Sequence, residues 1–418
     1  MKDIWQWLNS AVEQHGIGQE LQGAYAQLFG SSEAFDEAGV RQARDQFVEL
    51  SKRHNLPWLE VFGNHWYLQF QLTDLCMGEA CLDEAVSAFE FAHRPENVDC
   101  PQSVCTAQDL CIAYANVDGP GYAEQRLAAS RETLERIDPT WPCFDCINRE
   151  MAEALEDTEQ YDALIEFGPK IELLIRAEGQ KPVLRWATTH MVALRRSGRL
   201  GEAVEFEAST DRNRYTTHSP KADLGYDMER AILAALSGDQ DLAAQIGTEI
   251  PHPMSDLNVD AARWSEMQTH LTAVGVVDND SSLSTSRALL VERCLGRGSY
   301  WQALLIGIDG ANAAARRGAL ATAEVFADAA SEIGAKLRKK DVTNLRLADM
   351  YHEMGTAQAT AEPTDKDVEL ATLKTQVDQV TDQASGGQNS EDAAEIIGRY
   401  ADCLAENGWA GRSEKLLD

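Results

Sequence analysis

The cysteines are the residues of this chain whose type and spacing could most directly support chemistry. Seven of the nine lie between Cys76 and Cys146. "CPQSVC" holds Cys100 and Cys105, and "WPCFDC" holds Cys143 and Cys146. Four thiolates can bind zinc tetrahedrally, with each sulfur about 2.3 Å from the metal. The same pairs could instead form a disulfide or a redox pair, or pack as small apolar side chains, and packing is the interpretation that we favour.

Sequence motifs of common enzymes are missing. The chain has neither of the usual glycine-rich phosphate loops, and no serine nucleophile elbow. "YHEMGT" lacks the second histidine that a zinc protease needs. A segment resembling a calcium loop, 278–290, has Leu283 and Leu289 where the loop requires Gly and Glu. We therefore expect a protein that is not an enzyme and that needs no cofactor unless the cysteines hold zinc.

The charge of the chain limits the classes of partner. The formal net charge is −31, which repels the phosphate backbone of nucleic acids and favours a basic partner. The amino-terminal segment has acidic residues where an export signal needs an apolar run, and no apolar stretch is long enough for a membrane span. Together with an odd number of cysteines, these features lead us to expect a cytoplasmic protein that binds neither nucleic acid nor membrane.

A short sequence pattern recurs along the chain and indicates the helices that would position the cysteines. A small-residue turn is followed by the first turns of an amphipathic helix, with Ala or Leu about five positions later. Copies are found at 79–89, 158–167, 197–206, 237–246 and 317–326. Most gaps are near 40 residues or a multiple of it, and proline-containing segments lie half a period away. Because proline ends helices, each unit is predicted to be two helices with turns at both ends.

The predicted fold is an all-α solenoid, a right-handed stack of about eight antiparallel helical hairpins with a period near 40 residues. "GEACLDEAVSAFEFAHRP", with Ala85, Phe89, Ala92 and Pro95, resembles the second half of a tetratricopeptide repeat. The resemblance covers about residues 20–355, although the family's period is about 34. "RGSY" around Gly298 breaks the register, and we interpret it as a turn between repeats rather than an offset in the array.

The sequence also predicts how the chain is divided. Residues 1–19 are expected to form an amino-terminal helical cap, and residues 20–355 the repeat array. The polar, proline-containing segment 356–366 is expected to be a linker. Residues 367–418 then show helical periodicity again and are expected to form a carboxy-terminal helical cap.

The resemblance implies that the first helix of each hairpin lines a concave groove that holds an extended peptide or a helix of a partner. Helical spacing places the following residues on that face: Tyr67, Phe70, Asp109, Asn116, Arg149, Arg185, Thr188 and Arg195. The three arginines could clamp a carboxylate of the partner, or pair with the chain's own acidic residues. We therefore expect a non-catalytic scaffold that binds a protein or peptide. The alternatives are a peptide-responsive regulatory sensor, or a protein with a structural zinc or redox cluster at Cys100, Cys105, Cys143 and Cys146.

Overall fold

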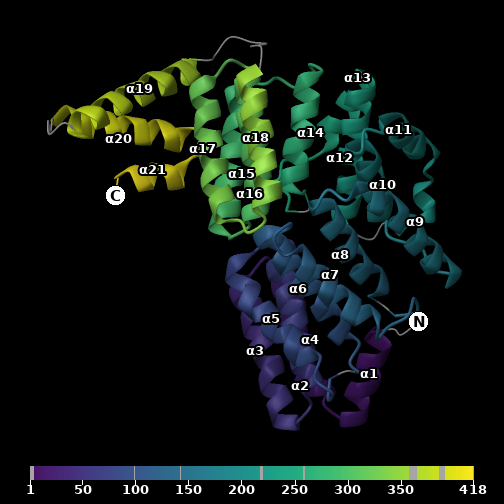
Figure 1. Ribbon diagram of the computed structural model, residues 1–418. Helices are drawn as coiled ribbons and strands as arrows, with labels where there is room; N and C mark the ends of the chain where they lie inside the picture. The colour runs from purple at the N-terminus through teal and green to yellow at the C-terminus, as the bar shows by residue number, and fades with distance from the viewer. Residues whose placement is uncertain are drawn as a thin grey trace. The chain divides into compact units, whose positions relative to one another are not determined.

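The computed structural model describes residues 4–97, 99–141, 143–216, 220–257, 259–356, 365–385 and 391–417. Every regular element in these residues is a helix, and one isolated bridge joins Val183 to Thr216. The prediction of an all-α fold is confirmed. The chain divides into two compact units, Met1–Tyr226 with Arg297–Ser299, and Asp227–Gly296 with Tyr300–Asp418 (Figure 1).

The first unit consists of antiparallel neighbouring helices, a π-helical turn η1 and a short 3-10 turn η2. Their bounds are α1 Ile4–His15, α2 Gly18–Glu33, α3 Glu37–His54, α4 Trp58–Gln69, η1 Phe70–Asp74, α5 Glu79–Ala92, α6 Gln102–Asp118, α7 Ala123–Leu134, α8 Phe144–Asp157, α9 Tyr161–Ala177, α10 Arg185–Arg196, α11 Leu200–Ser209 and η2 Arg212–Arg214. Helix α12, Pro220–Ser237, begins in this unit and ends in the second.

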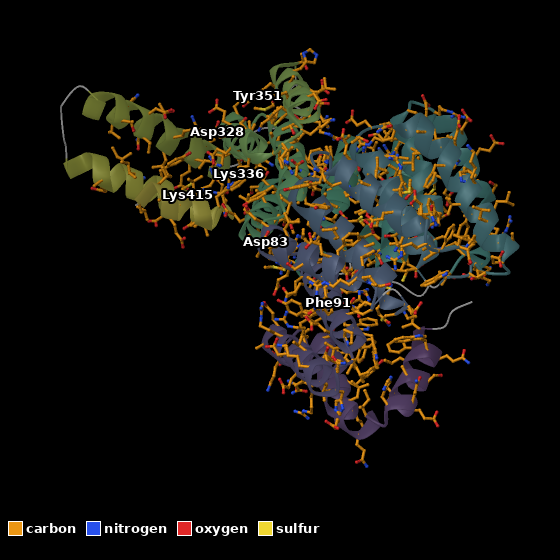
Figure 2. All side chains as sticks on the ribbon, turned by 60° about the horizontal axis from the view of Figure 1, so that its bottom comes forward. Asp83, Phe91, Asp328, Lys336, Tyr351 and Lys415 are labelled. Atoms are coloured by element: carbon orange, nitrogen blue, oxygen red, sulfur yellow. The ribbon has the colours of Figure 1, made fainter. Side chains whose placement is uncertain are left out.

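The second unit continues the same pattern of short turns between helices. Its remaining bounds are α13 Gln240–Glu249, α14 Ala261–Ala273, α15 Ser281–Gly296, α16 Tyr300–Arg316, α17 Leu320–Lys336, α18 Lys340–Thr356, α19 Asp365–Ser385, α20 Glu391–Glu406 and α21 Ala410–Leu417. Figure 2 draws the side chains, with Asp328 and Lys336 on α17 and Tyr351 on α18. Most of the predicted linker 356–366 lies outside the described residues.

The turns follow from the glycines that the recurring pattern contains. Gly198, Gly238 and Gly318 have φ of 79°, 85° and 80°, a left-handed conformation that glycine adopts without strain at a helix end. Each lies between an even-numbered helix and the odd-numbered helix after it. Gly298, with φ 68°, instead lies between α15 and α16. Its interpretation as a boundary between repeats stays a prediction.

Most helices pack on their neighbours in the chain, which is compatible with a helical repeat protein, whereas α14 packs mainly on α16. In the first unit, helices two apart also touch, since α4 contacts α6, α6 contacts α8, and α8 contacts α10. Within the described residues, no helix combines the length and the apolar character that crossing a membrane requires.

Candidate functional site

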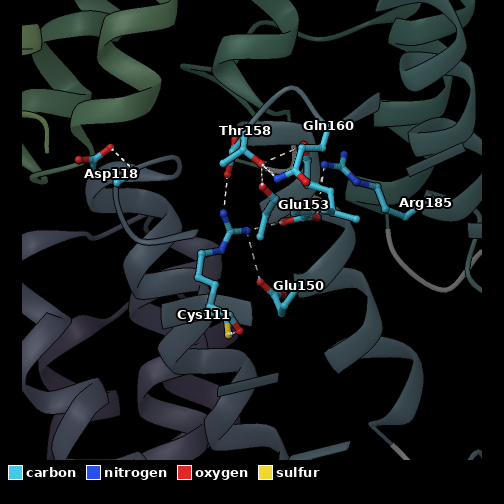
Figure 3. Close-up of polar contacts among 12 residues, drawn as sticks. Cys111, Asp118, Glu150, Glu153, Thr158, Gln160 and Arg185 are labelled. Carbon is cyan, nitrogen blue, oxygen red and sulfur yellow. Dashed lines mark hydrogen bonds and ion pairs between the residues drawn. The ribbon is translucent and has the colours of Figure 1, made fainter. Parts of the chain in front are cut away.

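A cluster of charged side chains at α7, α8 and α10 is the candidate site of the first unit (Figure 3). Glu150, Glu153 and Asp157 share one face of α8, because helical residues three, four or seven apart lie on the same side. Arg126 of α7 faces them, and Arg185 stands at the start of α10. These five residues are called the α8 charge cluster below.

Arg126 is the centre of the α8 charge cluster. Its Nη1 lies 2.5 Å from Asp157 Oδ2, and its Nη2 lies 3.9 Å from Glu150 Oε2 and 4.0 Å from Glu153 Oε2. Arg185 Nη2 lies 3.4 Å from Glu153 Oε1. Glu153 therefore stands between two guanidinium groups and links α7 to α10 through α8.

The α8 charge cluster has a buried floor and a partly exposed rim. The side chains of Arg126 and Glu150 are 0% and 3% exposed, whereas those of Glu153, Asp157 and Arg185 are 30%, 21% and 20% exposed. Arg126 Nε and Nη2 and Glu150 Oε2 are buried and make no hydrogen bond within the described residues. The floor therefore keeps hydrogen-bonding capacity that the surrounding side chains do not use.

Burial controls the protonation of this floor. Burial, with the nearby Glu153 charge, raises the pKa of Glu150 to about 8 against the opposing effect of Arg126. Burial acts to lower the pKa of Arg126, but Asp157, Glu150 and Glu153 more than offset it, and the pKa is raised. Burial thus favours the protonated form of Glu150, whereas Arg126 stays charged. Glu153 and Asp157 are left to balance Arg126 and Arg185.

A glycine makes room for the closest of these pairs. A Cβ at Gly119, the residue after α6, would lie 2.5 Å from the Oδ2 atom of Asp157. Only a residue without a side chain lets the Asp157 carboxylate stay where it meets Arg126. The turn between α6 and α7 is thus part of the site, although it holds no charged group of the cluster itself.

Two of the predicted groove residues, Arg149 and Arg185, lie on α8 and α10 and keep partial exposure. The other six are buried by the chain itself, and they are Tyr67, Phe70, Asp109, Asn116, Thr188 and Arg195. Their helices are packed on both sides, so the face assigned to a groove meets other helices of the chain. Among the described residues of the predicted set, Arg149 and Arg185 alone keep side-chain surface that a partner could contact.

The buried members of that set have partners within the chain. Asp109 Oδ2 lies 2.8 Å from His65 Nδ1, which joins α6 to α4. The Asn116 amide donates to the backbone oxygens of Leu72 and Met77, at 3.1 and 2.9 Å. Asn116 thereby holds the chain around the π-helical turn η1. These residues contribute to the fold at the positions where the sequence predicted binding.

Arg126 is the functional candidate that the sequence reasoning missed. It lies on α7, the second helix of its pair, where no groove residue was expected. A signal was present in the sequence. Arg126 lies on the same face of α7 as the small residues Ala123, Ala129, Ser130 and Thr133, and that face is buried. A charged residue within a stripe of small buried residues requires a partner of opposite charge.

The cysteines gather only in part. Cys105, Cys143 and Cys146 meet in one small cluster, whereas Cys100 Sγ lies 3.6 Å from Gln102 Oε1. All nine cysteines are free. Among the described residues, no group of three or more His, Cys, Asp or Glu side chains is arranged to hold a metal ion. The zinc site that we considered as an alternative at these four cysteines is not among the groups that the described residues form.

Comparison with known proteins gives no assignment to a family. No protein-family profile matches the chain, and no curated protein matches it in sequence.

Proposed function

We propose that this chain is a non-catalytic scaffold of stacked helical hairpins, and that the rim of the α8 charge cluster binds a basic protein or peptide. The spacing of the helices supports the stacking, because α10, α12, α14, α16 and α18 begin at residues 185, 220, 261, 300 and 340. Nine free cysteines fit a reducing compartment such as the cytoplasm.

The buried floor of the cluster is the observation that carries the proposal. Buried ion pairs contribute little net stability compared with apolar side chains of the same size, because removing charges from water costs several kcal/mol. A fully buried Arg126 with hydrogen-bonding groups left unused is thus a costly way to join α7 to α8. Its effect is to fix Glu153 and Asp157 in place at the partly exposed rim, where a partner can reach them.

The charge of α8 indicates the sign of the partner. The helix carries five acidic residues and a single basic one, Arg149. With a net charge of −31 for the whole chain, long-range attraction also favours a partner rich in Lys and Arg.

A peptide array of graded charge tests this function. We expect binding to rise with the number of Lys and Arg residues, and the double variant Glu153→Gln with Asp157→Asn to weaken it about tenfold or more. The matched control changes Asp162→Asn with Glu166→Gln on α9, where both residues are exposed and the same charge is removed. Equal losses in the two variants would mean that only bulk charge matters, and no selective binding by charge would refute the proposal.

A further inference from the structure

Three cysteine side chains meet where α6 and α8 begin. Cys105 lies in the first turn of α6, Cys143 is the N-cap residue of α8, and Cys146 lies in its first turn. They pack with Val104, Ala107 and Ile147 in one apolar cluster of the first unit. Cys143 adjoins both other thiols in this cluster, because the pKa of its thiol depends on Cys105 and on Cys146. Cys143 is therefore the central sulfur of a row of three.

The three thiols differ in their access to solvent. Cys105 and Cys143 are buried, at 3% and 7% exposure, and Cys146 is half-buried. The row thus leads from a half-buried residue on α8, through Cys143, to a buried residue on α6. Because α6 and α8 are in contact, a bond between Cys105 and Cys143 would join the two helices covalently.

We propose that Cys146, Cys143 and Cys105 form a reversible oxidation site, at which a small disulfide such as oxidised glutathione is the oxidant. The structure thus assigns a modification site to residues for which the binding function proposed above has no use.

The oxidation proceeds by three thiol–disulfide exchanges. The Cys146 thiolate attacks one glutathione sulfur, which releases one reduced glutathione and leaves a mixed disulfide. Cys143 then attacks the Cys146 sulfur and expels the second glutathione as its thiolate. Finally Cys105 attacks Cys143, so that the bridge lies between Cys105 and Cys143 and Cys146 regains its proton. Two protein thiols are oxidised, one glutathione disulfide is reduced, and the two protons go to the two glutathione thiolates.

The environment of the thiols sets the rate of this exchange. The interaction of the reduced Cys146 thiol with Cys143, together with burial, raises the pKa of Cys146 well above its ordinary value. Arg149 opposes this rise. The interaction with the Cys105 thiol is the main cause that raises the pKa of the Cys143 thiol. Since the thiolate is the nucleophile, oxidation is slow at neutral pH and accelerates about tenfold per pH unit.

Mass spectrometry after cleavage at aspartates can follow each bridge. Cleavage before Asp99, Asp109, Asp138, Asp145 and Asp157 places the three sulfurs in separate peptides, 99–108, 138–144 and 145–156. The full chain is equilibrated with glutathione buffers of increasing oxidised fraction, blocked with an alkylating agent, and cleaved. We expect two of the nine thiols to be lost, with peptides 99–108 and 138–144 joined through Cys105, as fragment spectra can distinguish from Cys100.

Single variants separate the steps. Cys105→Ala should stop the exchange at the bridge between Cys143 and Cys146. Cys143→Ala should leave only a mixed disulfide at Cys146, and Cys146→Ala should slow bridge formation at least tenfold. Cys76→Ala is the matched control, since Cys76 is also half-buried but lies outside the cluster, and it should not change the products. Circular dichroism checks that each variant remains folded.

Two results would overturn the proposal. One is that the cluster keeps all three thiols in fully oxidised glutathione at pH 8 while the protein stays folded. The other is that the wild-type chain ends with the bridge between Cys143 and Cys146, because the sulfur of Cys105 would then take no part.

Discussion

His65 and Asp109 face each other in the interior between α4 and α6, with 2.8 Å between His65 Nδ1 and Asp109 Oδ2. Both side chains are almost completely buried. Burial raises the pKa of the Asp109 carboxyl, and His65 counteracts that rise. The pair is therefore a polar link between two helices. Removal of one partner leaves the other buried without this hydrogen bond.

We predict that Asp109→Ala lowers the free energy of unfolding by about 3–5 kcal/mol, because it leaves the buried His65 without its partner. Denaturant unfolding followed by circular dichroism measures the change. Asp45→Ala is the control, since Asp45 is 64% exposed beside Arg44 and should change stability by less than about 0.5 kcal/mol. Similar losses in both variants would contradict the structural role of the pair.

Glu150 should make stability depend on pH. Its pKa is about 8 in the folded chain and about 4.3 in an unfolded one. The native state therefore holds a proton that the unfolded state releases between these values, and stability falls as pH rises through this window. Glu150→Gln removes that slope, which is at most about 1.4 kcal/mol per pH unit. The free energy of unfolding, measured from pH 5 to 8, should rise for Glu150→Gln relative to the wild type as pH rises. The exposed control Glu166→Gln should show the same pH dependence as the wild type.

Arg126 and Asp157 should be strongly coupled. A double-mutant cycle with Arg126→Ala and Asp157→Ala is expected to give a coupling energy of about 1–3 kcal/mol, because the two side chains share one buried contact. The same cycle on Lys170 and Glu166, an exposed pair of α9, should give less than about 0.5 kcal/mol. Equal coupling in the two cycles would show that burial of Arg126 has no energetic effect.

A buried carboxylate should fix the start of α19 in the second unit. Asp367 Oδ1 accepts hydrogen bonds from Arg317 at 2.8 Å and from Thr322 at 2.9 Å. Asp367→Ala should cost about 3–5 kcal/mol and leave a buried arginine without this partner. Hydrogen exchange should then accelerate in α19 more than in α14. Asp365→Ala, at an exposed position two residues earlier, is the control and should leave the exchange unchanged.

Two helical glycines, Gly63 in a buried position and Gly23 in an exposed one, should respond in opposite directions to alanine. A Cβ at Gly63 would lie 2.6 Å from the Cβ of buried Phe47, so Gly63→Ala should cost about 1–3 kcal/mol. A Cβ at Gly23 meets nothing within 4 Å, so Gly23→Ala should stabilise α2 by about 0.5–1 kcal/mol. Thermal melting can compare both variants, and a stabilising Gly63→Ala would argue against close packing of α3 on α4.

The helices and their turns could be predicted from the sequence because the signals are local. Gly198, Gly238 and Gly318 end helices through their own backbone conformation, and the prolines act on the residues beside them. Gly298 lies in the turn between α15 and α16, and its interpretation as a boundary between repeats stays a prediction. The repeat family and the period stay predictions, because local signals define each helix but not the stacking of distant ones.

The candidate site could be predicted much less well, because burial depends on neighbours that spacing within one helix does not reveal. Asp109 and Asn116 have the spacing of groove residues, but other helices cover that face and supply their partners. Arg185 was identified, while its pairing with Glu153 depends on how α8 meets α10. The gathering of Cys105 with Cys143 followed from helices starting at the same edge, but side-chain direction excluded Cys100.

The position of Arg126 also limits how this chain can have changed in length. Its guanidinium belongs to α7, whereas Glu153 and Asp157 belong to α8, so the ion pairs cross from one helical hairpin to the next. Loss or duplication of a single hairpin at this point would bury an arginine beside a helix that lacks the matching carboxylates. We therefore expect any related chain that keeps Arg126 to keep α7 and α8 together.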